Sequence, residues 1–145
     1  MIEMMALAAH AARDSQDPRT AVGCVVHHPE RGVLAVAANR LPPGLADTDP
    51  TRLAAPAKYL WIEHAERAAL MLAARDGIAT VGAAAFVHGG FPCADCARAI
   101  IAAGLVEVAF SLARSQVAHW EDSYRASRAM LTEAGVRVTE VAQAI

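Results

Sequence analysis

The chain has 145 residues, of which 55% are hydrophobic and 19% charged, so it can form a folded domain with a substantial core and is not a disordered protein. Its net charge of −2, without a cluster of Lys or Arg, argues against nucleic acid as the main partner, and no apolar run reaches the ~18 residues of a membrane span. Three cysteines are too few, and odd in number, for a disulfide framework, which predicts a reducing, cytoplasmic environment.

The first part of the chain predicts a helix, a hairpin and a long loop. Residues 2–14 have apolar positions at helical spacing, and their lack of a basic start favours an amphipathic helix over a signal peptide. Apolar runs at 21–27 and 32–38, joined by "HPERG", predict a hairpin of two strands. Residues 39–57 contain four prolines and few large apolar residues, so we expect a long loop there.

The rest of the chain alternates between helix and strand. Helices are predicted over 63–77, 93–104 and 119–135, and strands over 82–88, 106–112 and 136–141. This order predicts an α/β fold, a three-layer α/β/α sandwich around a mixed five-stranded sheet. No internal repeat or linker is visible, so residues 1–145 are expected to form a single domain.

Two cysteines lie three positions apart in "FPCADC", at the expected start of a helix. Pro92 suits the first turn of a helix, which places Cys93 and Cys96 at the positive end of the helix dipole, where thiolates are favoured. Taken alone, this pair is compatible with a redox couple, a structural zinc site or a catalytic metal site.

A second motif, "HAE" at residues 64–66, begins the preceding predicted helix, with one strand between the two helices. Helix starts arranged in this way can meet above one edge of a sheet, where His64 can join the two thiolates. Zn²⁺ favours N and S ligands, and three protein ligands leave the fourth position for water, as in catalytic zinc sites. Bound Zn²⁺ lowers the pKa of that water from its value in bulk water to roughly 7. Glu66, two residues after the histidine, is then placed to carry its proton.

The order His-x-Glu, then Pro-Cys-x-x-Cys, is typical of zinc deaminases. With "SQDPRTAVGCVV", "HAERAAL", "FPCADCARAIIAAG" and "LTEAGVRV", the chain resembles the cytidine/deoxycytidylate deaminase superfamily over nearly its whole length. The resemblance implies the cytidine deaminase-like fold and Zn²⁺ as cofactor. It implies His64, Cys93 and Cys96 as the zinc ligands and Glu66 as the catalytic acid and base.

Three further residues are predicted to contact the substrate. The resemblance matches Asn39 with the asparagine that contacts the sugar or base in relatives, and brings the backbone of Ala65 to the same pocket. His88 ends a predicted strand near the helix starts, so it either touches the substrate or is an ordinary hydrogen-bonded histidine at a strand end. "AANRLPPG" and "FVHGGFPC" depart from the usual dCMP deaminase pattern, which leaves phosphate recognition open.

Aromatic and basic residues near these motifs have two interpretations each. Trp61, Trp120 and Tyr124 can wall a base pocket. Trp120 and Tyr124 are four residues apart on one helix face, which favours core or subunit packing for these two. Three cations in or beside the long loop are either phosphate contacts or surface charges: Arg40, Arg52 and Lys58.

The resulting hypothesis is a hydrolytic zinc deaminase that converts an amino-pyrimidine, first of all dCMP or a related cytosine nucleotide or nucleoside, to its uracil form and ammonia. The alternatives are the same chemistry on a free base, guanine or a modified pyrimidine, a tRNA adenosine deaminase, and a non-catalytic zinc module. The last would need a fourth protein ligand, and no residue is well placed for it. The expected partners are a small-molecule substrate and further copies of the chain in a homo-oligomer, with no nucleic acid and no membrane.

Overall fold

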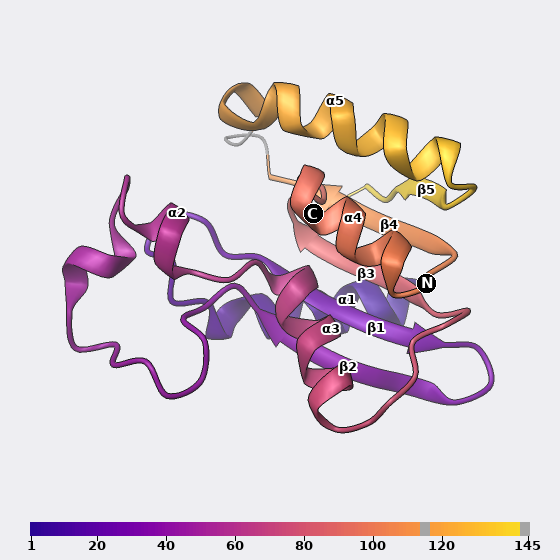
Figure 1. Ribbon diagram of the computed structural model, residues 1–145, viewed down its shortest axis with the longest axis horizontal. Coiled ribbons are helices and arrows are strands. Elements are labelled where there is room, and N and C mark those ends of the chain that lie inside the picture. The colour runs from indigo at the N-terminus through magenta and orange to yellow at the C-terminus, as the bar shows by residue number, and fades with distance from the viewer. Residues whose placement is uncertain (114–116, 143–145) are drawn as a thin grey trace.

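Five strands form one mixed sheet in the computed structural model, which describes residues 1–113 and 117–142 and, at residues 117 and 118, the backbone alone (Figure 1). The strands are β1 (Gly23–His28), β2 (Gly32–Ala38), β3 (Ala84–Gly89), β4 (Glu107–Leu112) and β5 (Arg137–Glu140). Their order across the sheet is β2-β1-β3-β4-β5. β1 runs antiparallel to β2 and β3, whereas β3, β4 and β5 are parallel, because a helix connects each of these strands to the next.

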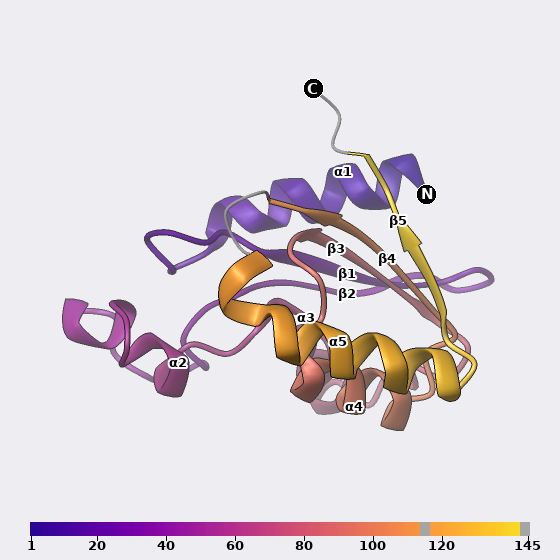
Figure 2. The same ribbon diagram turned by 90° about the horizontal axis from the view of Figure 1, so that it is seen from above.

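Helices cover both faces of this sheet. The helices of the described residues are α1 (Ile2–Ala11), α2 (Lys58–Trp61), α3 (Ala65–Arg75), α4 (Ala94–Ala102) and α5 (Val117–Glu133), with short 3₁₀ turns η1 (Ala12–Asp14) and η2 (Pro50–Leu53). Figure 2 shows α1 on one face of the sheet and α3, α4 and α5 on the other. The predicted three-layer α/β/α sandwich around a mixed five-stranded sheet is therefore confirmed.

The central strands are apolar on both sides because each side has its own core. Val25 on β1 and Phe86 on β3 pack against α1, whereas their neighbours Val26 and Val87 face the other helix layer. The approach of α1 to the sheet depends on Gly23, since a Cβ atom there would lie 2.0 Å from the carbonyl oxygen of Ala8 on α1.

One edge of the sheet gathers the helix starts. β3 leads into α4, so α4 begins beyond the carboxyl end of β3. α3 precedes β3 and runs in the opposite direction, so that its end leads back to the start of β3. α3 therefore begins at the same edge of the sheet as α4. The chain order alone thus brings the residues before α3 and α4 close together, as the sequence motifs predicted.

The predicted loop at 39–57 is only partly irregular. It contains η2 and leads into the short helix α2, and in Figure 1 the segment from residue 42 to 61 extends to the left of the sheet. We call this segment the arm. The predicted opening helix ends at Ala11 and continues as η1, and β2 occupies the predicted range. Over the described ranges, no helix combines the length and the apolar character that a membrane crossing requires.

Candidate active site

The starts of α3 and α4 bring one histidine and two cysteines together. His64 and Cys93 are the N-cap residues of the two helices, and Cys96 lies in the first turn of α4. The Nδ1 atom of His64 is 3.5 Å from the sulfur of Cys93 and 3.5 Å from the sulfur of Cys96. All three ligand atoms lie within 4.8 Å of one another.

This spacing fits a tetrahedral zinc ion. With Zn–S bonds of about 2.3 Å and Zn–N bonds of about 2.0 Å, tetrahedral geometry separates an N and an S ligand by about 3.5 Å. One imidazole and two thiolates are also the donor types that zinc prefers. Within residues 1–113 and 119–142, no fourth metal-binding side chain joins this group, so the arrangement leaves one position for water, as in catalytic rather than structural zinc sites.

The two thiols differ in their affinity for a proton. A hydrogen bond from Cys96 lowers the pKa of Cys93 to about 4 against the effect of burial, and His64 acts in the same direction as Cys96. The same hydrogen bond, together with burial, raises the pKa of Cys96. The pair therefore presents one thiolate at neutral pH before any cation arrives.

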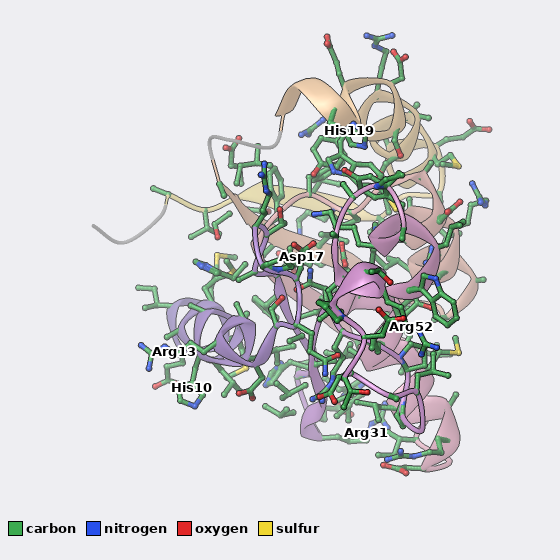
Figure 3. All side chains as sticks on the ribbon, turned by 90° about the vertical axis from the view of Figure 1, so that its left-hand side faces the viewer. His10, Arg13, Asp17, Arg31, Arg52 and His119 are labelled. Carbon is green, nitrogen blue, oxygen red and sulfur yellow. The ribbon has the colours of Figure 1, made fainter. Side chains whose placement is uncertain are left out.

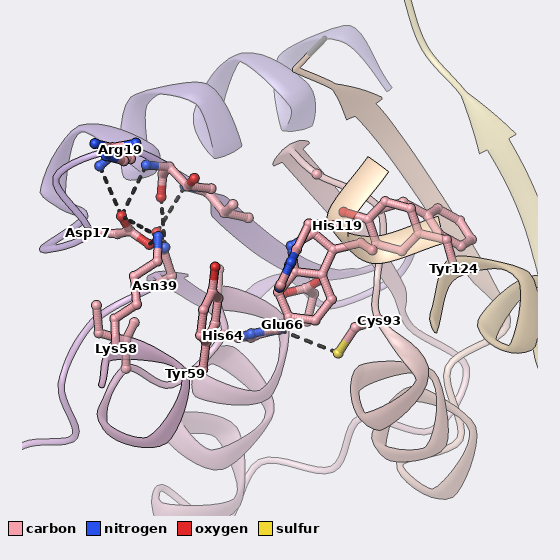
Figure 4. Close-up of a pocket in the computed structure, with 17 residues that line it drawn as sticks. Asp17, Arg19, Asn39, Lys58, Tyr59, His64, Glu66, Cys93, His119 and Tyr124 are labelled. Carbon is pink, nitrogen blue, oxygen red and sulfur yellow. Dashed lines mark hydrogen bonds and ion pairs between the residues drawn. The ribbon is translucent and has the colours of Figure 1, made fainter. Parts of the chain in front are cut away.

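A buried carboxyl group lies beside this cluster. Glu66 is in the first turn of α3 and is 4% exposed. Burial raises its pKa, and the neighbouring His64 opposes that effect. Both side chains line the same pocket (Figure 4). A buried carboxyl with a raised pKa, placed in a pocket beside a metal-binding group, is typical of a catalytic proton carrier.

Ion pairs tie the starts of α3 and α4 to each other. One carboxylate oxygen of Glu63 accepts a hydrogen bond from the backbone N–H of His64 at 2.9 Å and another from Nε of Arg67 at 2.7 Å. The same arginine reaches across to Asp95 on α4, with 3.4 Å between Nη1 and the carboxylate. Arg67 therefore links the segment that carries the histidine to the helix that carries the cysteines.

Helix α5 closes the other side. Ser123 accepts a hydrogen bond of 2.8 Å from the backbone N–H of Ala94, the residue after Cys93. One turn before it, Trp120 places its ring 5.5 Å from the ring of His64, at an interplanar angle of 82°. α5 thus holds the start of α4 and forms a wall beside the histidine.

These groups surround a pocket of about 560 Å³, a size usual for small-molecule sites. His64, Glu66 and Cys93 line one part of it, and the backbone of Ala65 lies between the first two. Farther from the cysteines, the lining includes one acidic and two basic side chains, Asp17, Arg19 and Lys58 (Figure 4). The pocket therefore joins a metal-binding and proton-transferring part to a part with a positive charge balance.

Comparison with known proteins places this arrangement in a family. Residues 1–112 match the model of the cytidine and deoxycytidylate deaminase zinc-binding region. The human deoxycytidylate deaminase is 34% identical over 137 residues, which cover 91% of this chain and 74% of the human enzyme. An uncharacterized deaminase from the luxG 3′ region of Aliivibrio fischeri is 35% identical over 129 residues, covering 86% of this chain and 82% of that protein. The crystal structure of the apo dCMP deaminase from the cyanophage S-TIM5 has a TM-score of 0.72 at 25% identity, covering 97% of this chain and 95% of that chain.

The chain belongs to the cytidine and deoxycytidylate deaminase family. It is a hydrolytic deaminase, and its cofactor is Zn²⁺.

In this deaminase, Asn39 and Ala65 both line the pocket, where the sequence placed them. The side chain of Asn39 also shapes the pocket wall. Its Oδ1 accepts hydrogen bonds from the hydroxyl of Ser15 at 2.6 Å and the backbone N–H of Val22 at 2.9 Å, and its Nδ2 donates to the carbonyl oxygen of Thr20 at 2.8 Å. A direct contact of Asn39 with the substrate remains a prediction.

His88 is not among the residues that line this pocket, and its contact with substrate stays a prediction. His88 lies on the same face of β3 as Phe86, which packs against α1, because strand residues two apart point the same way. The α3 and α4 helices cover the opposite face. Its Nδ1 is 3.1 Å from the hydroxyl of Ser111 on β4, which matches the alternative of a hydrogen-bonded histidine at a strand end.

Several pocket residues were not assigned to the site from the sequence. Trp120 and Tyr124 line the pocket, although their spacing favoured a packing role. Tyr124 has both roles, because its ring also packs against the ring of Phe91. The lining further includes residues that the sequence motifs did not single out as site residues: Arg19, Tyr59 and His119. The only sequence signal for Arg19 was its place inside "SQDPRTAVG".

Of the three cations beside the long loop, only Lys58 lines this pocket. Lys58 is 8% exposed and forms an ion pair with Asp17 at 2.9 Å. It is therefore not a solvated surface charge. Arg52 pairs with Asp49 at 3.7 Å and lies over the ring of Trp61, outside the lining of the pocket.

Proposed function

We propose that this enzyme deaminates dCMP, with water as the second reactant and dUMP and ammonia as the products. The observation that carries the proposal is that His64 and Cys93 of the metal-binding cluster, together with Glu66, line the same pocket as Arg19 and Lys58. The 34% identity to human deoxycytidylate deaminase supports the same substrate. We also propose that residues 1–145 act as one deaminase domain.

We assign Nδ1 of His64 and the sulfurs of Cys93 and Cys96 as the ligands of the zinc ion. When bound there, Zn²⁺ supplies Lewis-acid activation of a water molecule and lowers the pKa of that water from its value in bulk water to roughly 7. Two thiolates balance the charge of the ion, which suits a site whose cysteines are 4% and 0% exposed.

Glu66 is assigned the proton transfers. Its carboxylate takes a proton from the water that adds to C4 of the cytosine ring and delivers that proton to the ring nitrogen N3. After the second proton of the water has moved through the same carboxylate to the amine, the C4–N bond breaks and ammonia leaves. The burial of Glu66 keeps competing solvent away from these transfers.

The basic part of the pocket is assigned to the 5′-phosphate. Both carboxylate oxygens of Asp17 accept hydrogen bonds from Nζ of Lys58, at 3.1 and 2.9 Å, so this lysine is fixed in place. The same carboxylate accepts the backbone N–H of Arg19 at 2.9 Å, which orders the turn that carries the guanidinium. Two basic groups against one acidic group leave a net positive charge, which favours a nucleotide over an uncharged nucleoside or base.

A substrate panel tests the proposal. We expect ammonia release from dCMP to exceed release from deoxycytidine, cytosine, guanine and adenosine, measured with zinc-loaded enzyme. Arg19→Gln should raise the KM for dCMP at least about tenfold, the value of one charge-assisted hydrogen bond, without changing the rate for deoxycytidine. Arg13→Gln is the matched control, because Arg13 is exposed on η1 outside the pocket (Figure 3). Faster turnover of guanine or free cytosine would contradict dCMP as the substrate.

Two finer proposals follow from the sequence and the family. Free thiols at Cys93 and Cys96 require a reducing compartment, so we place the enzyme in the cytoplasm. We also propose that it assembles as a homo-oligomer.

A further inference from the structure

Two adjacent glycines, Gly89 and Gly90, lie where β3 ends, and only the first is required by the backbone. Gly89 has a φ of +94°, and a Cβ atom at this position would lie 2.3 Å from the carbonyl oxygen of Ala21. Gly90 has no positive φ, and the nearest non-neighbouring atom to a Cβ placed there is 3.7 Å away, an ordinary van der Waals distance. The fold therefore accepts a side chain at residue 90, and the glycine there needs another explanation.

The missing side chain leaves space inside the substrate pocket. Gly90 lines this pocket together with Val22 and Tyr124. A Cβ atom at residue 90 would lie 3.7 Å from Cγ2 of Val22 and 3.8 Å from the hydroxyl oxygen of Tyr124. We call the space between these three residues the recess. A side chain larger than that of alanine would fill it, because the Cβ atom alone already contacts both walls.

The walls of the recess are held in place by their own contacts. The ring of Tyr124 meets the ring of Phe91 edge-on at 5.4 Å and stacks on the ring of Trp120 at 6.4 Å. On the other side, the backbone of Val22 exchanges hydrogen bonds with Asn39, since its N–H donates to Oδ1 at 2.9 Å and its carbonyl accepts the N–H of Asn39 at 3.1 Å. Neither wall can move into the recess without losing these contacts.

The recess lies beside the metal-binding cluster rather than in the basic part of the pocket. Gly90 is three residues before Cys93, which lines the same pocket. Burial raises the pKa of Tyr124 to about 12, against a hydrogen bond from the backbone, and the charges of Glu66 and both metal-binding cysteines act with burial. Figure 4 shows Tyr124 and Cys93 on one side of Glu66, with Arg19 on the other. The phenol therefore keeps its proton at neutral pH and can donate it to a group near the reaction centre.

We propose that the recess at Gly90 receives a small substituent on C5 of the cytosine ring, so that the enzyme deaminates 5-methyl-dCMP and 5-hydroxymethyl-dCMP as well as dCMP. This inference rests on the proposed function, in which C4 lies at the metal and N3 faces Glu66. C5 is the other ring neighbour of C4, so it points away from Glu66. N1 lies opposite C4 and directs the sugar and phosphate toward Arg19. The recess is then the part of the pocket that faces C5.

The size and chemistry of the recess fit such a substituent. A methyl or hydroxymethyl group adds one or two heavy atoms, which is the size of the small side chain that Gly90 lacks. Val22 offers an apolar contact to either group, and the hydroxyl of Tyr124 offers a hydrogen bond that only the hydroxymethyl group can use. The reaction is unchanged, because water replaces the amine at C4 and the group on C5 takes no part. Gly90 is thus a specificity-determining residue.

A competition experiment tests this role of Gly90. Zinc-loaded enzyme receives equal amounts of dCMP and 5-methyl-dCMP, and chromatography of the two products gives the ratio of their kcat/KM values. We expect the two values to lie within about tenfold of each other for the natural sequence. Gly90→Val should lower the ratio of 5-methyl-dCMP to dCMP at least about tenfold, because a methyl group in a hydrophobic pocket is worth about that much or more. Gly90→Ala should lower it by less.

Ala126→Val is the matched control, since Ala126 is exposed on α5 and outside the pocket, and its ratio should equal that of the natural sequence. Circular dichroism checks the fold of each variant, and Gly90→Ala decides the question if Gly90→Val does not fold. A separate variant, Tyr124→Phe, tests the hydroxyl. It should lower the ratio of 5-hydroxymethyl-dCMP to 5-methyl-dCMP by about fivefold, the value of one neutral hydrogen bond. A purely structural role of Tyr124 would leave that ratio unchanged.

The outcomes separate this inference from the proposed function. Efficient use of dCMP with more than tenfold poorer use of 5-methyl-dCMP would overturn the inference and leave dCMP as the substrate. An unchanged ratio in the folded Gly90 variants would also overturn it, because C5 would then face another part of the pocket. An enzyme that deaminates none of the three nucleotides would overturn both proposals.

Discussion

The starts of α3 and α4 and the arm both supply side chains to the pocket, but they do so in different ways. His64, Cys93 and Cys96 lie at helix starts that the order of strands and helices brings to one sheet edge. Lys58 and Tyr59 lie in a proline-rich segment that reaches the pocket through side-chain contacts. The first region is determined by fold topology and the second by individual contacts, so substitutions in the two should have different consequences.

The largest effect is expected at Glu66. Glu66→Ala should lower the rate of ammonia release by about 10³-fold, within the range of general acid–base catalysis, because no other carboxylate among the described residues lines the pocket beside His64. Zinc content, measured with a chromogenic chelator, should stay the same. Unchanged turnover would refute the role of Glu66 in proton transfer, and loss of zinc would make it a ligand.

Cysteine substitutions test whether metal binding belongs to the helix starts alone. Cys96→Ser should reduce zinc affinity by at least about a hundredfold, because a neutral hydroxyl replaces a thiolate ligand. Cys24→Ala is the control, since Cys24 is fully buried in β1 and outside the ligand cluster. It should keep one zinc per chain in a competition titration. Loss of zinc from the Cys24→Ala variant, with zinc retained by Cys96→Ser, would show that Cys24 rather than Cys96 binds the metal.

The difference between the two regions also explains what the sequence could predict. The layers and the sheet follow from alternating apolar segments, and β2 at Gly32–Ala38 matches its predicted range. The predicted helix at 63–77 begins only at Ala65, because His64 has an extended backbone, with φ −69° and ψ 147°, as an N-cap residue requires. The extended backbone of His64 therefore determines both where α3 begins and where the metal-binding imidazole lies.

The substrate part of the pocket could not be predicted in this way. The ion pair between Lys58 and Asp17 joins residues 41 positions apart, and Tyr59 stacks on His119 with ring centroids 5.1 Å apart. No periodic pattern in the sequence connects such residues. For His88, the sequence indicated a place at the end of a strand, and β3 ends at Gly89, but position alone did not determine which face of the sheet the side chain occupies.

The ion pair at the base of the arm should affect stability as well as substrate binding. The side chains of Lys58 and Asp17 are 9% and 7% exposed, and Lys58→Met leaves the carboxylate buried without its partner. We expect the free energy of unfolding to fall by about 3 kcal/mol, measured by urea denaturation. Arg125→Met, which removes an exposed pair with Glu121, should cost less than about 1 kcal/mol. Equal losses in the two variants would mean that the arm is not held through Lys58.

The smallest effect is expected where α5 touches the helix start. Ser123→Ala removes the acceptor for the N–H of Ala94 and should lower the free energy of unfolding by about 1 kcal/mol. Because that N–H follows Cys93, zinc affinity should also fall, by about tenfold, as is usual when a group that orients a metal ligand is lost. Ser111→Ala is the matched control, since Ser111 is buried and bonded to His88 on the other face of the sheet. It should lose comparable stability with no change in zinc affinity. Equal zinc affinity in both variants would show that Ser123 supports the fold alone, and that the helix start presents its cysteines without help from α5.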